Sequence, residues 1–529
     1  MRNLSILIAL LVALPIAAQT DSFEKFHQQK EQQFDRFKNQ RQQEFDAYRQ
    51  RVNAEYAEFM RRSWREFPVQ EPIRPVKEEE VPPVIYQPEP EPEPAPAPKP
   101  KEEPKVDTKP TPQPTPQPTP QPEPKPEPAP APPTAPIAVK PTVIVMPEPE
   151  PAPAPIAPVQ PKEEPFKKVS VSYFGSLVSI GFPVKEDFKL NSLSENAIAD
   201  AWQQLSDSRY DITIKTVLDA RDANALCDWA YMNMLREVCT KHYGNTNKAV
   251  LAQAFLMVQS GYRIRLAFTD DKLMFLIACQ YTIFDMPYYT IDGIRYYEFG
   301  GNNARSMYIC EAKFDAEKSL SLQIAQLPKF PWDGTQKRML TSKKGVAAPS
   351  SVNKNFIDFL NTYPQACYKD DQSTRWAAYA NTPLDKAVKD MLYAPLRKTI
   401  QGMSEREAVE ILLNWVQTAF VYEYDDKVWG HDRAFLSQET LYYPYCDCED
   451  RSILFSRIIR DLLGLDVVLL HYPGHLATAV AFSNDEAGDY LTFNKRRYTV
   501  CDPTYINAGV GRTMPSCANK KAQVIALKK

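Results

Sequence analysis

The sequence predicts an α+β protein built from several separate parts. Residues 195–310 and 383–529 interleave segments of helical periodicity with apolar runs typical of buried strands. Residues 68–165 hold 36 of the 49 prolines, and residues 22–67 contain neither glycine nor proline. A chain of 529 residues is too long for one compact core, so we expect at least two folded units with connections between them.

The first 18 residues are typical of a signal peptide. Arg2 gives a positive start, residues 4–14 form an apolar run, and Ala17 and Ala18 supply small residues for cleavage. We therefore expect an exported protein, periplasmic or extracellular. The apolar run is shorter than the roughly 20 residues that a bilayer-spanning helix needs, and no later stretch is both long and apolar enough, so no transmembrane span is expected.

Charge and cysteine content narrow the classes of partner. Lys and Arg number 63 against 66 Asp and Glu, for a net charge of −3, so the concentrated basic face that nucleic acid requires is not expected. Nine cysteines, all at or beyond residue 227, leave at least one thiol unpaired within a single chain. Up to four disulfides and a largely reduced set of buried cysteines both fit this count.

Residues 19–67 predict one long amphipathic helix. Aromatic pairs recur every 11 residues along it, at Phe23/Phe26, Phe34/Phe37, Phe45/Tyr48 and Tyr56/Phe59. Eleven residues make three helical turns, so the pairs share one face of a helix about 70 Å long. This aromatic stripe predicts self-association, or docking on the catalytic part of the chain or on another partner; an isolated helix is the third alternative.

Residues 68–165 predict a Pro-rich, disordered linker. Proline lacks a backbone donor and fixes φ, so this tract cannot form a helix or a sheet. At about 3.1 Å per residue an extended tract of this length could reach about 300 Å. It serves either as a spacer that holds the C-terminal part away from the helix or as a solvated tether of no required length.

Three segments of globular composition follow. Residues 166–311 predict an α/β region that opens with a hairpin around Gly175 and continues with helices over 195–260 and then strands. Residues 312–382 are rich in turn formers and predict a mostly β or irregular connection. Residues 383–529 predict the last domain, in which Ser404 and Glu407 form the capping box of a helix.

The candidate chemistry begins at a predicted helix near residue 448. Asp447 is a suitable N-cap, which places Cys448 in the first turn of a helix that ends at Gly464. Free amide groups and the positive end of the helix dipole favour a thiolate there, and the thiolate is the reactive form of cysteine. The helix is apolar nearly all round, so we expect it to be buried.

Two further elements supply partners for this thiol. DVVLLHY and LATAVAF predict a pair of buried strands, and the Pro-Gly turn between them places His475 at the mouth of the second. RYTVCD predicts a third strand, which ends at Asp502. A cysteine nucleophile, a histidine base and a carboxylate that orients the imidazole are the members of a catalytic triad.

These motifs resemble the transglutaminase-like superfamily. The resemblance is carried by CEDRSILF, by the histidine at a strand start after a glycine turn, and by the strand that ends in DPT. It covers about residues 385–529 and implies a papain-like core, with Cys448 as nucleophile, His475 as base and Asp502 as the orienting group. The superfamily includes transglutaminases, proteases and peptide amidases, so the resemblance implies a peptide or protein substrate and neither a metal nor an organic cofactor.

Other interpretations of the same residues stay open. Cys446 is the competing nucleophile, although it precedes the helix and lacks the help of the dipole. Cys448 and His475 are alternatively ordinary core residues. Glu449 and Asp450 fit charges at a helix start. A zinc site is a further alternative, although its spacing matches usual zinc sites poorly; its ligands would be Cys446, Cys448, His475 and Cys501.

The sequence also contains a candidate internal repeat. Residues 245–277 align without gaps on residues 448–480, so that a helix, a glycine stop and two strands coincide. A generic helix–strand–strand pattern would give a similar match by chance. In the first copy the catalytic positions hold residues unsuited to the chemistry: Asn245 for the cysteine, Lys272 for the histidine and, with one gap, Glu298 for the aspartate. A true repeat would make residues 195–310 an inactive copy, able to bind a chain or to pack against the second copy.

The leading functional hypothesis is a thiol-dependent enzyme of the cell envelope that transfers an acyl group from an amide. Water as acceptor makes it a protease or amidase, and an amine as acceptor makes it a cross-linking enzyme. The rival hypothesis is a non-catalytic envelope binding or scaffold protein that retains the transglutaminase-like fold.

Overall fold

The computed structural model describes residues 29–87 and 135–528. Within these ranges it leaves out positions 31, 35, 38, 42, 141, 158, 160–164, 186–187, 270, 302–303 and 336. The signal peptide expected at residues 1–18 and the middle of the proline-rich tract therefore lie outside the described residues.

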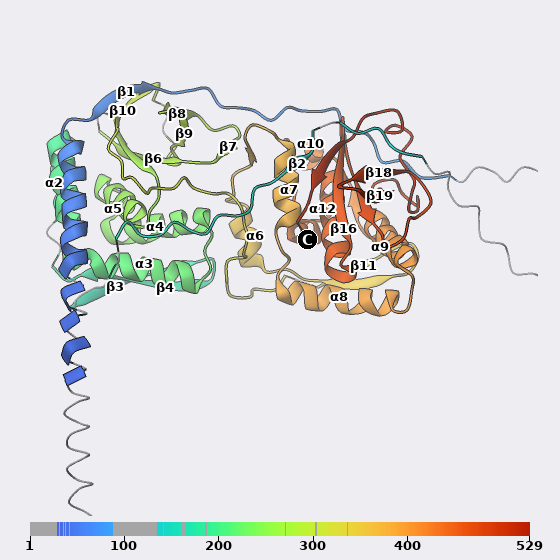
Figure 1. Cartoon of the computed structure of the whole chain (residues 1–529), viewed down its shortest axis with the longest axis horizontal. Coiled ribbons are helices and arrows are strands. Elements are labelled where there is room, and N and C mark those ends of the chain that lie inside the picture. Colours follow the sequence, from blue (N-terminus) through green and yellow to red (C-terminus); the bar gives the residue numbers. More distant parts are fainter. Residues whose placement is uncertain are drawn as a thin grey trace, which may run out of the picture.

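The described chain is a mixed α+β structure in which two lobes lie side by side (Figure 1). The N-terminal lobe is built on residues 166–322 and the C-terminal lobe on residues 366–528. Each contains a six-stranded sheet with helices packed against it, and one edge strand of each sheet, at residues 64–68 or 144–145, comes from the preceding part of the chain. Residues 323–365 connect the lobes. No helix of the described residues is long and apolar enough to cross a membrane.

The N-terminal lobe opens with the hairpin predicted around Gly175, in which Tyr173 pairs with Ser176 next to the turn. Helices and then strands follow in the expected order. Its elements are β3 (Phe166–Tyr173), β4 (Ser176–Pro183), α2 (Glu195–Leu205), η1 (Ser208–Tyr210), α3 (Asp211–Ala223), α4 (Asp228–Tyr243), α5 (Asn247–Gln259), β5 (Ile264–Phe268), β6 (Leu273–Ala278), β7 (Tyr281–Ile283), β8 (Tyr288–Ile291), β9 (Ile294–Tyr297) and β10 (Ser306–Cys310).

The connection is more helical than predicted. Residues 312–382 were expected to be β or irregular, yet they contain α6 (Lys354–Leu360) and α7 (Ser373–Asn381) beside the strands β11 (Arg338–Thr341), β12 (Ala347–Ser350) and β13 (Ala366–Tyr368). The side chain of Asn353 accepts a hydrogen bond from the backbone of Asn355 and so caps α6. Such short helices carry too few apolar positions for their periodicity to stand out in the sequence.

The C-terminal lobe places helices before its sheet. The capping box of Ser404 and Glu407 is present at the start of α9, as predicted. The remaining elements are α8 (Lys386–Ile400), α9 (Glu405–Ala419), β14 (Val421–Tyr422), α10 (Asp425–Val428), α11 (Ser437–Tyr442), β15 (Tyr445–Cys446), α12 (Cys448–Leu463), β16 (Asp466–Tyr472), β17 (His475–Ala481), β18 (Tyr490–Phe493), β19 (Arg496–Cys501) and β20 (Gln523–Ala526).

The two large sheets have the same topology. The strand order is β8-β9-β6-β5-β10-β1 in the N-terminal lobe and β18-β19-β17-β16-β20-β2 in the C-terminal lobe. The first five strands of each sheet pair antiparallel throughout, and a helix, α5 or α12, precedes the two central strands. The edge strands differ, because β1 (Trp64–Pro68) is antiparallel to its neighbour whereas β2 (Ile144–Val145) is parallel. Helix, central strands and strand order thus recur together, as in a duplicated unit.

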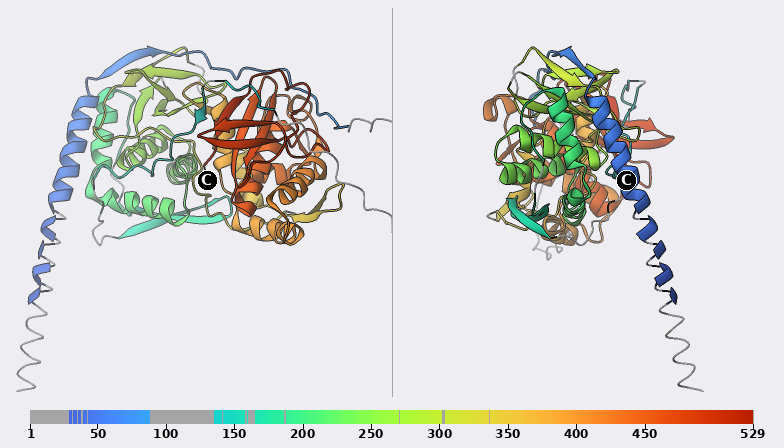
Figure 2. Two further views of the ribbon diagram at one scale, coloured as in Figure 1. Left: turned by 45° about the vertical axis from the view of Figure 1, so that its right-hand side comes forward. Right: turned by 90° about the vertical axis from the view of Figure 1, so that its left-hand side faces the viewer.

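The N-terminal helix spans residues 29–60 and docks on the N-terminal lobe through its last turns. Tyr56 is buried and stacks on Phe314, with ring centroids 4.4 Å apart. The Arg49 guanidinium forms a buried ion pair of 2.5 Å with Asp211. Earlier in the helix, Phe34 is 66% exposed, and Figure 2 shows that part of the helix projecting beyond the lobes.

The helix is shorter than predicted. It ends at residue 60, and residues 64–67, which were expected to continue it, belong with Pro68 to β1 on the edge of the N-terminal sheet. Pairing with β10 gives these residues inter-strand hydrogen bonds in place of helical ones, and this long-range partner overrides the local periodicity. The C-terminal part of the aromatic stripe therefore docks within the chain, but on the N-terminal lobe and not on the predicted catalytic part. Self-association stays a prediction for the exposed part.

Both described ends of the proline-rich tract lie on the lobes. Residues 69–87 run from β1 to the C-terminal lobe, and residues 135–157 return across it (Figure 1). The Tyr86 and Ile137 N–H groups donate to carbonyls of Ile506 and Tyr490. The described ends are extended, as predicted, but they are not a free spacer, because the residues between the prolines pair with sheet and loop edges. The prediction that the tract forms no sheet is wrong for Ile144 and Val145, which lie beside β20 in the C-terminal sheet.

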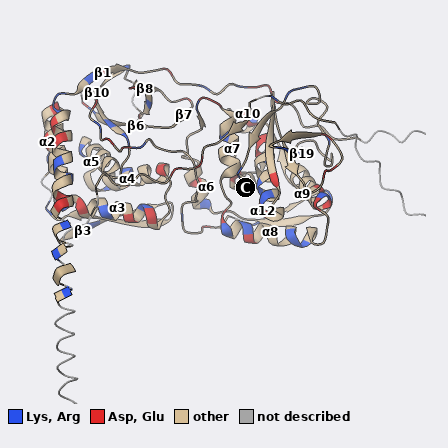
Figure 3. Cartoon of the chain, in the orientation of Figure 1, with Lys and Arg blue, Asp and Glu red and all other residues tan. Residues whose placement is uncertain are grey.

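Charged residues are interspersed over both lobes. Figure 3 shows Lys and Arg beside Asp and Glu along α3, α8 and α12. All nine cysteines, each in the described part of the chain, are free thiols. Eight of them are buried, which matches the largely reduced alternative rather than a disulfide framework.

Candidate active site

The helix predicted to carry the nucleophile is α12, which begins at Cys448. Asp447 and Asp450 form a reciprocal capping box, in which each carboxylate accepts the backbone N–H of the other residue. Gly464 ends the helix in the left-handed conformation, with φ of 67°. Both predicted boundaries of this helix are confirmed, and its start places Cys448 at the positive end of the helix dipole.

His475 lies at the first residue of β17, directly after the Pro-Gly turn. The pair Tyr472↔His475 closes the hairpin between β16 and β17, and Gly474 has φ of +72° in the turn. Asp502 follows the last residue of β19, which pairs with β17. Because β17 and β19 are antiparallel neighbours, the start of one strand and the end of the other place the imidazole and the carboxylate at the same end of the sheet.

The imidazole and the carboxylate are hydrogen-bonded. The distance from His475 Nε2 to Asp502 Oδ2 is 2.9 Å, and both side chains are buried. Asp502 Oδ1 accepts the backbone N–H groups of Thr504 and Tyr505 at 2.8 and 3.2 Å, which fix the carboxylate. His475 Nδ1 is buried and has no hydrogen-bond partner among the described residues. The ring is therefore oriented through one nitrogen and carries a vacant hydrogen-bonding position on the other.

Cys448 and His475 line one cavity of about 60 Å³. The hydroxyl of Ser452, one turn after Cys448 on α12, donates to the Leu476 carbonyl at 2.7 Å. This bond ties the nucleophile's helix to the strand of the base. The structure therefore brings together all three residues that the sequence singled out.

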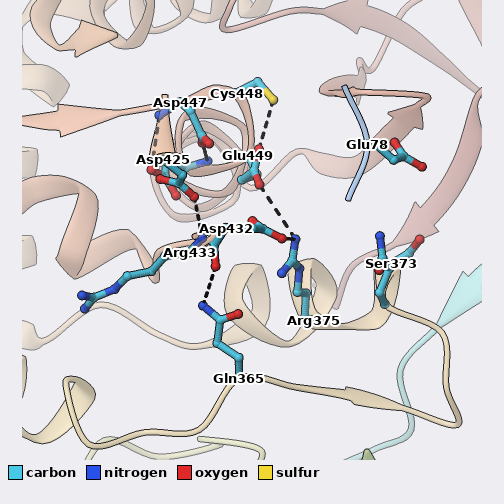
Figure 4. A network of polar contacts seen from close by, with 12 residues as sticks. Glu78, Gln365, Ser373, Arg375, Asp425, Asp432, Arg433, Asp447, Cys448 and Glu449 are labelled. Atoms are coloured by element: carbon cyan, nitrogen blue, oxygen red, sulfur yellow. Dashed lines mark hydrogen bonds and ion pairs between the residues drawn. The ribbon is translucent and has the colours of Figure 1, made fainter. Parts of the chain in front are cut away.

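The Cys448 thiol is protonated in this arrangement. Burial raises the pKa of the thiol well above its usual value, and the neighbouring Glu449 and Asp447 carboxylates raise it further. The thiol donates a hydrogen bond to Glu449 Oε2 at 3.1 Å (Figure 4). The sequence predicted the opposite effect from the helix dipole alone, because neither the burial nor the position of the Glu449 side chain could be inferred from it.

An acidic cluster lies beneath the helix start. Oxygens of Asp425, Asp447 and Glu449 lie within 4.8 Å of one another. Burial, followed by the neighbouring carboxylates, raises the pKa of Asp425 to about 8 and raises that of Asp450 well above its usual value. Glu449 and Asp450 lie in the first turn of α12, as expected of charges at a helix start, and both are buried.

Arginine side chains approach this cluster from one side. Arg375, fully buried on α7, forms a 2.6 Å ion pair with Asp432 and lies 4.0 Å from Glu449 (Figure 4).

The carboxylate oxygens of Asp425, Asp447 and Glu449, at the spacing given above, are the donor type that a hard divalent cation takes. The grouping of Cys446, Cys448, His475 and Cys501 for zinc is not found among the described residues.

Cys446 lies apart from the cavity. It belongs to the short strand β15, its thiol contacts the Val421 carbonyl at 3.8 Å, and it is not among the residues that line the cavity. Burial raises the pKa of this thiol to about 11. The competing nucleophile therefore lacks access to His475.

The sequence did not indicate that residues 76–80 would close the cavity. Val76, Lys77, Glu78 and Glu80 line it together with Cys448. They come from the tract whose composition predicted a free linker, so only a three-dimensional structure could place them here.

The corresponding position of the N-terminal lobe is also hollow. The three residues aligned with the triad, Asn245, Lys272 and Glu298, line one cavity of about 480 Å³ at the start of α5. This cavity contains no thiol or imidazole. The three residues lie near element ends that correspond to those of the triad. The match in position is not complete, because Asn245 precedes the N-cap of α5 and Lys272 precedes the first residue of β6, whereas Cys448 and His475 begin α12 and β17.

The sequence matches no model of a known protein family, and no curated protein matches it. The resemblance to the transglutaminase-like superfamily therefore stays a prediction that rests on the residues themselves.

Proposed function

We propose that this protein is a thiol-dependent acyl-transfer enzyme that acts on a peptide or protein substrate in the cell envelope. The observation that carries the proposal is the geometry of His475: its Nε2 is bonded to Asp502, and its unpartnered Nδ1 belongs to a ring that lines the same cavity as Cys448. A papain-like arrangement of helix start, strand start and strand end would produce this geometry.

The reaction begins with transfer of the thiol proton to His475 Nδ1. The Cys448 side chain must first turn from Glu449 towards the imidazole, because the thiol donates to Glu449 in the resting structure. The sulfur then attacks the substrate carbonyl carbon, a C–S bond forms, and the π electrons move to the carbonyl oxygen. Asp502 stabilises the imidazolium that results.

We propose Tyr422 as a donor to the developing oxyanion, although its side chain does not line the cavity in the resting structure. Its hydroxyl is buried without a hydrogen-bond partner among the described residues. Burial, and then the neighbouring Cys448 and Asp447 groups, raise its pKa, so the phenol remains a donor. The free N–H of Cys448 at the helix start is a second donor.

Collapse of the tetrahedral intermediate completes acyl transfer. The C–N bond breaks, and His475 returns its proton to the leaving amine, which leaves a thioester on Cys448. Water then yields a hydrolase, and an amine yields a cross-linking enzyme. We favour hydrolysis of a peptide or envelope polymer because export of the chain is expected.

The rival function is a non-catalytic binding protein, and one observation favours it. The protonated thiol is paired with Glu449 rather than with the imidazole. Alkylation with a thiol-directed electrophile separates the two functions, because a catalytic Cys448 reacts in a manner that depends on His475. A rate that is the same in wild type and His475→Ala supports the binding protein.

A further inference from the structure

Residues 76–81 bind to the edge of the candidate active site through both backbone and side-chain contacts. The Val76 N–H donates to Gln372 Oε1 at 2.8 Å, and Gln372 Nε2 donates to the Val76 carbonyl at 3.1 Å. Farther along, the Val81 N–H donates to the Gly474 carbonyl at 2.8 Å. Such contacts recognise an extended backbone irrespective of its side chains.

The Glu78 carboxylate fills a site built for an anion. Its Oε2 accepts the Gly474 N–H at 2.6 Å and lies 3.1 Å from His471 Nε2. These hydrogen bonds, with that of His471 the larger cause, lower the pKa of Glu78 to about 2. The carboxylate is therefore ionised and directly bound.

His471 is held in place for this contact. It is 6% exposed, its ring lies 4.7 Å from that of Trp376, and its Nδ1 lies 3.4 Å from the Ser373 hydroxyl. Both partners belong to α7, which flanks the cavity. The carboxylate site is thus formed by a strand and a helix of the C-terminal lobe, and residues 76–81 only occupy it.

Gly474 permits the close approach of the segment. A Cβ atom on this residue would lie 1.9 Å from the Glu79 carbonyl oxygen, and the φ of +72° also favours glycine. The turn that places His475 therefore also provides the surface on which residues 78–81 lie.

The bound segment narrows the catalytic cavity, which stays partly open to solvent. Val76, Lys77, Glu78 and Glu80 form one wall, and the remaining volume is about 60 Å³. This volume accommodates a few water molecules but not a peptide with its side chains. A peptide substrate with its side chains therefore needs the segment to leave before it can bind beside Cys448.

We infer that residues 76–81 occupy the substrate cleft, and that His471 with the Gly474 N–H forms a subsite for a glutamate side chain of an extended peptide substrate. This inference rests on the proposed function and names its substrate class. The chain's own Glu78 fills the subsite in the resting state and thereby inhibits the enzyme.

The first test replaces Glu78 in the full mature chain. Glu78→Gln removes the charge and leaves an amide that cannot accept both hydrogen bonds as well as the carboxylate does. Glu79, the exposed neighbour of Glu78, provides the matched control Glu79→Gln. We expect amide hydrogen exchange at Val76 and Val81, and alkylation of Cys448 by a bulky maleimide, to accelerate at least about tenfold in Glu78→Gln and to stay unchanged in the control.

The second test supplies the segment in trans. A peptide of residues 72–84 with blocked ends is added to the Glu78→Gln chain, with glutamate or glutamine at the position of Glu78. The glutamate peptide should slow alkylation of Cys448 and bind at least about tenfold more tightly than the glutamine peptide. A peptide that ends at residue 77 with a free carboxylate should not compete, because the occupant is an internal side chain.

Three results would overturn the inference: unchanged exchange and alkylation in Glu78→Gln, equal binding of the two peptides, or preference for the terminal carboxylate. None of these readouts requires turnover. If the alkylation rate of Cys448 does not depend on His475 while peptide binding selects glutamate, only the proposed function is refuted. If the alkylation rate depends on His475 while the two peptides bind equally, only the subsite is refuted.

Discussion

Raising the pH from about 5 to about 8 should weaken the binding of residues 76–81 to the C-terminal lobe. Glu80 is the group responsible. Its Oε2 atom is buried without a hydrogen-bond partner among the described residues. Burial, and then the Glu449, Asp432 and Asp426 carboxylates, raise its pKa from 4.5 to about 7, and Lys77 opposes them.

The sign follows from the direction of the shift. The bound segment holds a proton on Glu80 that the released segment loses, so the contribution of Glu80 to binding is complete below 4.5 and is lost as the pH rises through about 7. Glu78 acts in the other direction, because its pKa is lowered to about 2; its contribution is complete above 4.5 and is lost only as the pH falls below that value. Of these two glutamates, Glu80 is therefore the one whose contribution changes between about pH 5 and pH 8.

The magnitude is moderate. A shift from 4.5 to about 7 would correspond to about 3.4 kcal/mol if it were expressed in full. Glu80 is only about half-buried, so solvent screening reduces this to about 1–2 kcal/mol, or about 5- to 30-fold in the equilibrium for release.

The assay is the hydrogen-exchange protection factor of the Val81 amide, corrected for the intrinsic rate at each pH. Glu80→Gln is the control, because it removes the titrating group while Asp425, Asp447 and Asp450, whose pKa values are also raised, stay in place. We expect the protection factor to fall by about 5- to 30-fold between about pH 5 and pH 8 in wild type and to change little in the variant. A flat profile in wild type, or the same slope in Glu80→Gln, would refute the reasoning.

Three further predictions concern the site and its support. In a chain whose segment 76–81 is released by Glu78→Gln, Tyr422→Phe should lower kcat on a peptide substrate by about 10²- to 10³-fold with little change in KM. A higher KM at unchanged kcat would indicate a binding role instead. Ser452→Ala removes the buried bond from α12 to the strand of the base and should lower the free energy of unfolding in urea by about 1–3 kcal/mol, more than Ser456→Ala, whose hydroxyl bonds only within its own helix. Tyr56→Ala should weaken docking of the N-terminal helix by about 3–5 kcal/mol, measured as local hydrogen exchange, whereas Phe37→Ala, at a 56% exposed residue, should leave it unchanged.

The sequence predicted those features that short-range rules control. The α12 boundaries follow from Asp447 and Gly464, and the hairpin that presents His475 follows from two apolar runs around a Pro-Gly turn. The position of Asp502 follows from the end of an apolar strand. Each of these signals lies within a few residues of the feature that it predicts.

The features that the sequence did not predict depend on distant contacts. The composition of the proline-rich tract is compatible with a free chain. The backbone groups that accept hydrogen bonds from Val81 and Tyr86 belong to residues far along the sequence, Gly474 and Ile506. The pKa of Cys448 depends on burial beneath this segment and on the direction of the Glu449 side chain. Strand order is likewise a long-range property, so the alignment suggested the common topology of the two lobes without establishing it.

The most direct test of the central claim is the rate at which iodoacetamide alkylates each cysteine, followed by mass spectrometry across pH. It compares wild type, Glu78→Gln, and both with His475→Ala. The account predicts that label accumulates on Cys448 rather than Cys446, that it does so below neutral pH in the Glu78→Gln chain, and that His475→Ala removes this reactivity. Slow labelling of Cys448 that is indifferent to His475 in both backgrounds, or label concentrated on Cys446, would contradict it.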